Sequence, residues 1–281
     1  MMWPRILLLT AAALAVQAQS KKTVFIITDA EGVAGICRQE QTETKDPELR
    51  ALLTAEANAA VEGFLQGGVD EVIVWDGHSN SSTLSVQTIH PKAKLMIGGA
   101  GRTMTLERGY SAIAFLGQHS KAGVRKGIMA HSYSSLGIQN IRLNGKPVGE
   151  TETRTMLAGA FNTPVILLTG DNAAVNEMKA LVPDAETAAV KEGLARYTCI
   201  SMSAPAAREA IRAAAQRAAA KIGKVQPYKV TGPVTIEIEY TTRNSLRIDA
   251  NYALGGEIVD DRTIRYTGKD FMDAWTKARI W

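Results

Sequence analysis

Short, continuous apolar segments alternate with longer amphipathic ones through the first two thirds of the chain. Residues 23–28 and 70–75 are runs of mostly apolar, β-branched side chains, which predicts strands buried on both faces. Between them, apolar side chains recur at helical spacing from Pro47 onward, and Gly67-Gly68 predicts the end of that helix. This order predicts a βαβ unit, and therefore a mainly parallel sheet flanked by helices.

Further apolar runs predict that the sheet continues, and they lie at residues 94–97, 112–116, 127–130 and 165–168. A run at 138–143 leads into Asn144-Gly145, a dipeptide that favours a tight hairpin turn. Helices are expected at 150–161 and directly after Asp171, whose side chain can cap a helix N-terminus.

The pattern changes near Pro183. Residues 205–222 form an amphipathic, Ala/Arg-rich segment, and residues 234–240 alternate strictly between apolar and polar, as a half-solvated antiparallel strand does. A last helix is expected at 269–280. We therefore expect an α/β domain over residues 19–185, followed by a smaller α+β C-terminal domain over residues 186–281.

The N-terminus reads as an export signal. Arg5 precedes an apolar run at 6–16, and the small side chains of Val16-Gln17-Ala18 predict cleavage after Ala18, which makes residues 1–18 a signal peptide. The alternative is an uncleaved anchor, but the run is too short to span about 30 Å of hydrocarbon. We expect a periplasmic or secreted protein with no membrane attachment after cleavage, in which Cys37 and Cys199 could pair.

The composition excludes some classes of binding partner and some classes of metal site. Lys+Arg 32 against Asp+Glu 28 is a small excess without any long run of like charges, so nucleic acid is not an expected partner. Cys 2 excludes a disulfide scaffold and a cysteine-based metal cluster. His 4 is a low count, so the positions of the histidines carry information.

Polar side chains gather where the predicted strands end. The set consists of Asp29, Glu31, His78, His119, His131 and, at the start of a predicted helix, Glu150. Ligands bind beyond the carboxyl ends of strands in an open α/β sheet, so these side chains are expected to share one edge. Each also has an ordinary explanation: solvated carboxylates, loop histidines bonded to the backbone, or an acid favoured by a helix N-terminus. His90, which precedes Pro91, is interpreted as structural.

Carboxylates and imidazoles on one edge predict a metal site. Zn²⁺ binds both donor types, and this set exceeds what one catalytic zinc needs, which suggests two ions that share a bridging carboxylate. Carboxylate-rich sites also accept Mn²⁺ or Co²⁺. The sequence contains no His-Glu-x-x-His, Walker A or Gly-x-Ser-x-Gly motif, and Gly99-Ala100-Gly101 is only a partial dinucleotide-binding loop.

These residues resemble a known family. Asp29-Ala-Glu31-Gly, Asp76-Gly-His78, Gln118-His119, His131-Ser and Asn144-Gly-Lys-Pro-Val-Gly-Glu150 are similar, in order, to motifs of the zinc-dependent D-aminopeptidase family, peptidase family M55. The resemblance implies two zinc ions bridged by Asp29, with Glu31 and His119 completing one site and His78 and Glu150 the other. It also implies that His131 is catalytic, and we interpret its role as proton transfer or oxyanion stabilisation rather than as a nucleophile.

Three functions remain open at this point. The first is an aminopeptidase that hydrolyses short peptides with an N-terminal D-residue such as D-alanine, and the family implies a homo-oligomeric, ring-like assembly. The second is a two-metal amidase or esterase of the same fold with another substrate. The third is a secreted metal- or peptide-binding protein without catalysis.

Overall fold

The computed structural model describes residues 21–246 and 254–280. The expected signal peptide over residues 1–18 lies outside these residues. Within the described part of the chain, no helix combines the length and the apolar character needed to cross a membrane.

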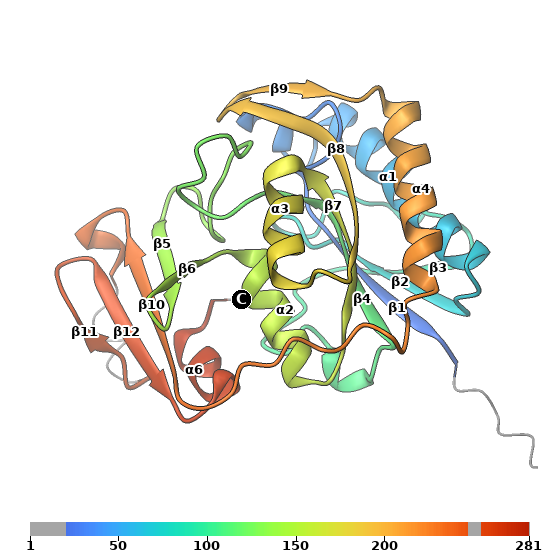
Figure 1. Ribbon diagram of the computed structural model, residues 1–281. Helices are drawn as coiled ribbons and strands as arrows, with labels where there is room; N and C mark the ends of the chain where they lie inside the picture. The colour runs from blue at the N-terminus through green and yellow to red at the C-terminus, as the bar shows by residue number, and fades with distance from the viewer. Residues whose placement is uncertain (1–20, 247–253, 281) are drawn as a thin grey trace, which may run out of the picture.

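A seven-stranded sheet forms the centre of the described structure, in the order β3-β2-β1-β4-β7-β8-β9 (Figure 1). All neighbouring strands are parallel except the edge strand β9, which is antiparallel to β8. Its strands are β1 (Thr23–Thr28), β2 (Glu71–Trp75), β3 (Ala93–Met96), β4 (Ala112–Gln118), β7 (Val165–Asp171), β8 (Glu186–Ala195) and β9 (Thr198–Ser201). The side chains of β1 and β4 are almost entirely buried, as their continuous apolar sequences predict.

Helices cover the two faces of this sheet (Figure 1). Helices α1 (Pro47–Gln66) and α4 (Ala204–Ala219) pack against each other on one face, and α2 (Glu150–Ala160) and α3 (Asn172–Leu181) lie on the other. The α1–α4 contact is close because Gly63 has no Cβ, which would lie 2.2 Å from the Arg212 carbonyl oxygen. The Asp46 and Asp171 side chains cap α1 and α3, as expected from their sequences.

A second, antiparallel sheet has the order β11-β12-β10-β5-β6. Its strands are β5 (Ile138–Leu143), β6 (Lys146–Val148), β10 (Val234–Tyr240), β11 (Glu257–Ile258) and β12 (Thr263–Gly268). Asn144 and Gly145 have φ of +49° and +78°, so they form the predicted hairpin turn. Helix α6 (Phe271–Ala278) packs on this sheet and buries Trp275. Short 3₁₀ helices lie at Gln39–Thr42, Leu106–Arg108 and Arg243–Ser245.

The structure confirms the predicted fold class but corrects one strand. Residues 127–130 were expected to be a strand and instead form a turn and loop. The Ile128 N–H donates to Asp171 Oδ2 at 2.8 Å, and the Met129 N–H donates to the Arg196 carbonyl oxygen at 2.9 Å. Because these N–H groups bond to a side chain and to a loop carbonyl, the segment does not pair with a neighbouring strand.

The two sheets do not divide the chain at residue 185. Strands β8 and β9 follow that position but extend the larger sheet, because β8 pairs with β7 from Leu167–Glu186 onward. Strands β5 and β6 precede it but belong to the smaller sheet, through the pairing of β5 with β10.

Candidate metal centre

The predicted site residues gather at the carboxyl ends of β1, β2 and β4, beside a cavity of about 880 Å³. Strand order reverses at this point, because the chain proceeds from β1 to β2 and β3 on one side and places β4 on the other. Such a reversal opens a crevice at the strand ends. The cavity therefore lies where an open α/β sheet usually binds its ligand.

Two glycines bring the first and third of these strand ends together. A Cβ on Gly32 would lie 2.1 Å from the Gln118 carbonyl oxygen, and one on Gly117 would lie 2.3 Å from the Asp29 carbonyl oxygen. The Gly32 N–H donates to the Gly117 carbonyl oxygen at 2.7 Å. The loop that carries Asp29 therefore lies directly against the strand that ends in His119.

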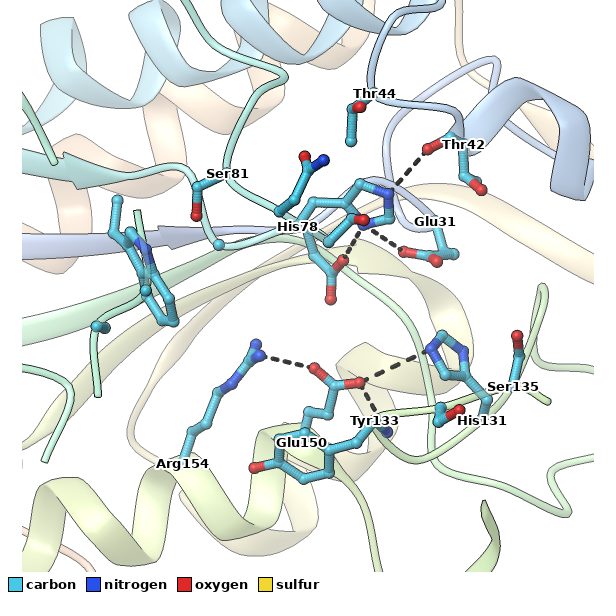
Figure 2. Close-up of a pocket in the computed structure, with 18 of the residues that line it drawn as sticks. Glu31, Thr42, Thr44, His78, Ser81, His131, Tyr133, Ser135, Glu150 and Arg154 are labelled. Carbon is cyan, nitrogen blue, oxygen red and sulfur yellow. Dashed lines mark hydrogen bonds and ion pairs between the residues drawn. The ribbon is translucent and has the colours of Figure 1, made fainter. Parts of the chain in front are cut away.

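Asp29 and Glu31 both lie beside His78. The His78 Nδ1 atom lies 3.1 Å from Asp29 Oδ1. The same atom lies 3.6 Å from Glu31 Oε2, and Figure 2 shows Glu31 beside the ring. Both acids are almost fully buried, with relative exposures of 5% and 4%. Both carboxylates lie on the side of His78, as the two-residue spacing predicts, but residues 30–33 form a turn, closed by the Val33 N–H donating to the Ala30 carbonyl oxygen at 3.1 Å, and not the expected extended backbone.

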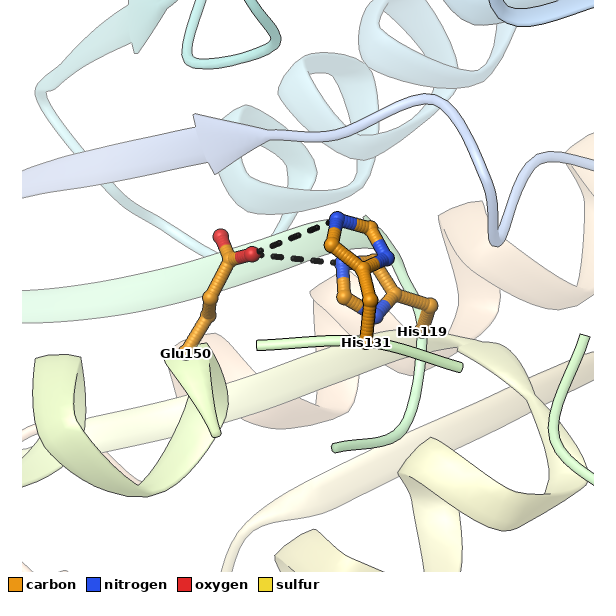
Figure 3. Close-up of side chains that lie close together, drawn as sticks. All are labelled: His119, His131 and Glu150. Atoms are coloured by element: carbon orange, nitrogen blue, oxygen red, sulfur yellow. Dashed lines mark ion pairs between the residues drawn. The ribbon is translucent and has the colours of Figure 1, made fainter. Parts of the chain in front are cut away.

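Glu150 and His119 form the second half of the cluster. The His119 Nε2 atom lies 3.4 Å from Glu150 Oε1 and 3.6 Å from Asp29 Oδ2, so Asp29 lies between the two halves. The His131 Nε2 atom lies 3.8 Å from the same Glu150 oxygen, and its ring stacks on that of His119 (Figure 3). The structure thus brings all six predicted residues together.

Backbone carbonyls orient all three imidazoles of the cluster. The His78 Nε2 atom lies 2.8 Å from the Thr42 carbonyl oxygen, and the Nδ1 atoms of His119 and His131 each lie 2.9 Å from a carbonyl oxygen, of Ser120 and Met129. In each ring the nitrogen beside the carbonyl is the donor, and the other nitrogen points at the carboxylates. This is the arrangement found in metal-binding histidines, where the outer N–H fixes the tautomer.

In the half of the cluster formed by Asp29, Glu31 and His78, the closeness of the two carboxylates shifts the pKa of each group. Burial and the charge of Glu31 raise the pKa of Asp29. Burial favours the neutral form of Glu31, but the charges of His78 and His119 outweigh it and lower the pKa of that carboxyl. Burial also opposes a charged His78, yet its hydrogen bond to Asp29 and the charge of Glu31 raise its pKa to about 9. The two carboxylates therefore need nearby positive charge to remain ionised in this buried position.

In the half of the cluster formed by His119, His131 and Glu150, the surroundings shift the pKa values of the two histidines in opposite directions. Burial opposes a charged His119, but the nearby carboxylates of Glu150, 3.4 Å from Nε2, and of Asp29 raise its pKa well above the usual value. Burial and the charge of His119 lower the pKa of His131 to about 4. The carboxyl of Glu150 has a lowered pKa because the charges of Arg154 and His119 outweigh its burial.

The donor set fits divalent metal ions. Glu31 Oε2 and His119 Nε2 are buried and have no hydrogen-bond partner among the described residues, which is costly unless another group satisfies them. Two overlapping groups of three residues, which share His119, have donor atoms close enough to hold an ion: Asp29, Glu31 and His119, and His119, His131 and Glu150. Nitrogen and carboxylate oxygen donors without sulfur suit Zn²⁺, Mn²⁺ or Co²⁺.

Buried polar side chains hold the loops that carry the histidines. Asp76 accepts hydrogen bonds from the backbone N–H groups of Thr83 and Leu84 at 2.7 and 2.8 Å, which closes the loop around His78. The His131 loop is held by the Asp171 contact to Ile128, and Met129 and Tyr133 on either side have φ of +48° and +62°. Non-glycine residues at positive φ are uncommon and often accompany functional sites.

Lys191 holds the loop of Glu31, and the sequence analysis did not identify this role. Its Nζ donates to the carbonyl oxygens of Glu31, Val33 and Ile36, and the side chain is buried. A buried lysine normally needs a carboxylate partner, whereas here three carbonyl dipoles surround the charge. Sequence offered only the position of this lysine within the otherwise uncharged segment 187–191.

Arg154 and Tyr133 were also missed. The Arg154 Nη2 atom lies 2.8 Å from Glu150 Oε2, and the Tyr133 N–H donates to Glu150 Oε1 at 3.0 Å (Figure 2). Arg154 lies one helical turn after Glu150, so the i, i+4 spacing is the signal that could have found it.

The remaining candidate residues lie elsewhere. His90 takes no part in the cluster, and its Nδ1 accepts a hydrogen bond from the Lys92 N–H at 3.2 Å. Cys37 and Cys199 are free, half-buried thiols. Burial and the neighbouring Cys199 thiol raise the pKa of Cys37 to about 11, so the two are close together.

Known proteins share this sequence and fold. A protein named D-aminopeptidase from Bacillus subtilis (strain 168) is 28% identical over 259 residues, which covers 90% of this chain and 93% of the relative. The solved structure of the Zn-dependent D-aminopeptidase DppA from Bacillus subtilis, described as a self-compartmentalizing protease, superposes with a TM-score of 0.83 at 27% identity, over 91% of this chain and 95% of that one. The family model described as D-aminopeptidase matches residues 23–280, and the chain therefore belongs to peptidase family M55.

Proposed function

We propose that this M55 peptidase hydrolyses short peptides that carry an N-terminal D-amino acid such as D-alanine, with two zinc ions at the Asp29 cluster. The observation that carries the proposal is the set of three buried carboxylates and three carbonyl-oriented imidazoles beside one cavity. The name D-aminopeptidase of the Bacillus subtilis relative supports the D-residue, and the description of the solved Bacillus subtilis structure as Zn-dependent supports the zinc.

The distances favour a particular division of the ligands. Asp29 would be shared by the two ions, with Glu31 and His119 at one, because the donor atoms of these three residues lie within 4.8 Å of one another. His78, which lies 3.1 Å from Asp29, and Glu150 would hold the other ion, which is the division implied by the family resemblance. When bound, zinc would polarise the substrate carbonyl and lower the pKa of a coordinated water.

His131 is suited to move protons in this reaction. Its Nδ1–H is engaged with the Met129 carbonyl, so Nε2 carries the lone pair and faces the cavity near Glu150. In the proposed reaction, Nε2 takes a proton from the attacking water and delivers it to the departing amine. Glu150 and the stacked His119 hold the ring in place during both transfers.

Hydrolysis of D-alanyl-p-nitroanilide tests the activity. We expect release of p-nitroaniline, loss of activity after removal of metal with a chelator, and recovery with zinc. The L-alanyl compound is the matched control and should be cleaved much more slowly. Full activity in metal-free protein would overturn the mechanism. A panel of amides and esters separates an amidase or esterase from a peptidase, and metal binding without any turnover would identify a binding protein.

We also propose export and self-association. Export to the periplasm or the medium is supported by the signal-like residues 1–18, and N-terminal sequencing of the mature protein should begin at Gln19. A homo-oligomeric, ring-like assembly is supported by the description of the Bacillus subtilis structure as self-compartmentalizing. Light scattering coupled to size-exclusion chromatography should give a mass several times that of one chain, and a monomeric mass would contradict it.

A further inference from the structure

Arg154 is a fixed positive charge in the wall of the cavity. Among the described residues that line the cavity, it is the only lysine or arginine. Its side chain has a relative exposure of 9%, and its Nη2 atom is paired with Glu150 Oε2. The guanidinium also lies over the rings of Trp75 and Tyr133, 5.9 and 5.7 Å from their centroids. These contacts fix its position and orientation before any ligand binds.

One edge of this guanidinium has no partner. Arg154 Nη1 is buried and donates no hydrogen bond in the described structure. An arginine cannot lose its proton to escape this cost, so a buried, unpartnered N–H on it favours binding of an acceptor. A carboxylate is the strongest common acceptor for a guanidinium.

The location of Arg154 sets how far a bound acceptor group would lie from the candidate metal ligands. Glu150 contacts Arg154 through Oε2 (Figure 2) and faces His119 and His131 through Oε1 (Figure 3), so a single carboxylate separates the guanidinium from the candidate metal ligands. In a dipeptide, one residue of about 3.8 Å separates the scissile carbonyl from the terminal carboxylate. A group held at Arg154 Nη1 would therefore be the C-terminus of a very short substrate.

We propose that Arg154 binds the free α-carboxylate of the substrate, which makes dipeptides with a free C-terminus the preferred substrate class of this cavity. The inference rests on the proposed peptidase function and narrows its substrates. Arg154 acts as a specificity-determining residue, while its pairing with Glu150 supports the metal centre for every substrate alike.

Two substrates that differ only at the C-terminus test the proposal. The zinc-loaded enzyme is assayed with D-alanyl-D-alanine and with D-alanyl-D-alanine amide. We expect kcat/KM for the acid to exceed that for the amide by about tenfold or more, since a charged hydrogen bond is lost. In Arg154→Met the ratio should fall to about one, and Arg154→Lys should retain an intermediate ratio because it keeps the charge without the planar fork.

The ratio isolates substrate recognition from damage to the site. Any effect of Arg154→Met on Glu150 lowers both activities equally and cancels. Arg217→Gln is the matched control, since it removes a surface charge paired with Glu186 on α4, and its ratio should equal that of wild type. Equal loss on both substrates in Arg154→Met, or a wild-type ratio near one, would overturn the carboxylate site and indicate contact with the scissile carbonyl instead.

Failure of the wider proposal gives a different result. If no D-aminoacyl compound is cleaved by wild type, the proposed peptidase function fails, whereas cleavage with an unchanged ratio defeats only the role of Arg154. In the first case, calorimetric titration of the same proteins with the two dipeptides still measures the ratio of affinities. We expect about tenfold tighter binding of the acid by wild type and no difference in Arg154→Met. Equal affinities in wild type would overturn the inference.

Discussion

The imidazoles of His119 and His131 stack with ring centroids 4.0 Å apart and planes within 12° of parallel (Figure 3). Despite this contact, the two rings have different surroundings. His119 Nε2 is within 3.6 Å of both Asp29 and Glu150. His131 Nε2 lies 3.8 Å from Glu150, which is its one ion-pair partner among the described residues, and it also lines the cavity. The stack therefore places a ring suited to bind metal beneath a ring suited to transfer protons.

This difference predicts opposite results for two alanine variants. His119→Ala should lose zinc, because a candidate ligand with a buried donor atom disappears. His131→Ala should retain the zinc content of wild type while kcat falls by about 100-fold or more, the usual contribution of a general base. Zinc per chain after dialysis and kcat on D-alanyl-p-nitroanilide measure the two effects separately. Equal loss of zinc in both variants would show that His131 is a ligand.

Much of the metal cluster could be predicted because its residues directly follow uninterrupted apolar strands. β1, β2 and β4 have the mostly apolar sequences of strands in a parallel sheet, and Asp29, His78 and His119 come within three residues of their ends. Adjacent parallel strands end at the same edge, so strand assignment alone brings these side chains together.

The position of His131 could not be derived in the same way. It was expected to end a strand at 127–130, but long-range contacts to Asp171 and Arg196 hold it on a loop instead. Nothing in the local sequence specifies partners that lie more than forty residues away.

Arg154 and Lys191 were missed because charged residues usually indicate a solvated surface. The first six residues of α2, ETETRT, are all charged or hydroxyl-bearing, a composition typical of an exposed helix. All six are nevertheless buried, because α3, α6, β4 and β6 contact the helix. Similarly, Glu186, Lys191 and Glu192 give β8 the charged composition of an exposed segment. Lys191 is nevertheless buried, and its Nζ donates to backbone carbonyl oxygens.

Lys191 should be needed for both stability and zinc affinity. Lys191→Met leaves the carbonyl oxygens of Glu31, Val33 and Ile36 without their donor, so we expect unfolding free energy to fall by about 3 kcal/mol. Zinc should also bind more weakly, because the Glu31 loop loses its anchor. Urea unfolding of metal-free protein and competition with a chromophoric chelator measure these effects. Lys179→Met, an exposed change on α3, is the control, and identical zinc affinity in both variants would contradict the anchoring role.

Glu56 should make stability depend on pH. Burial raises its pKa from 4.5 to about 7. Oε1 accepts a hydrogen bond from the Ala34 N–H at 2.9 Å, but Oε2 has no hydrogen-bond partner in the described part of the chain. The folded protein therefore holds this proton more tightly than the unfolded chain does. Ionisation destabilises the fold as pH rises from 4.5 through about 7, and the cost is complete above that range.

Glu56→Gln cannot ionise and should escape this cost. We expect the difference in unfolding free energy between variant and wild type to shift by about 3 kcal/mol in favour of the variant between pH 4.5 and about pH 8. Urea titrations of metal-free protein across this range give the difference at each pH. Glu48→Gln removes a charge from the exposed side of the same helix and should not reproduce the shift. A difference that is independent of pH would show that Glu56 is already ionised throughout.

The neighbouring Cys37 and Cys199 provide a test of the compartment. The Gly35 N–H donates to Ser201 Oγ at 2.8 Å, so the loop that follows Glu31 runs beside β9 and brings the two thiols together. If the protein is exported, an oxidising compartment should convert the pair to a disulfide, whereas protein expressed without residues 1–18 in a reducing cytoplasm should retain both thiols. Alkylation under denaturing conditions counts them: we expect none in exported protein and both in the cytoplasmic form. Cys37→Ser should leave one reactive thiol in either compartment. Two free thiols in exported, correctly cleaved protein would contradict the expected disulfide and would show that Cys37 and Cys199 are neighbours only through packing.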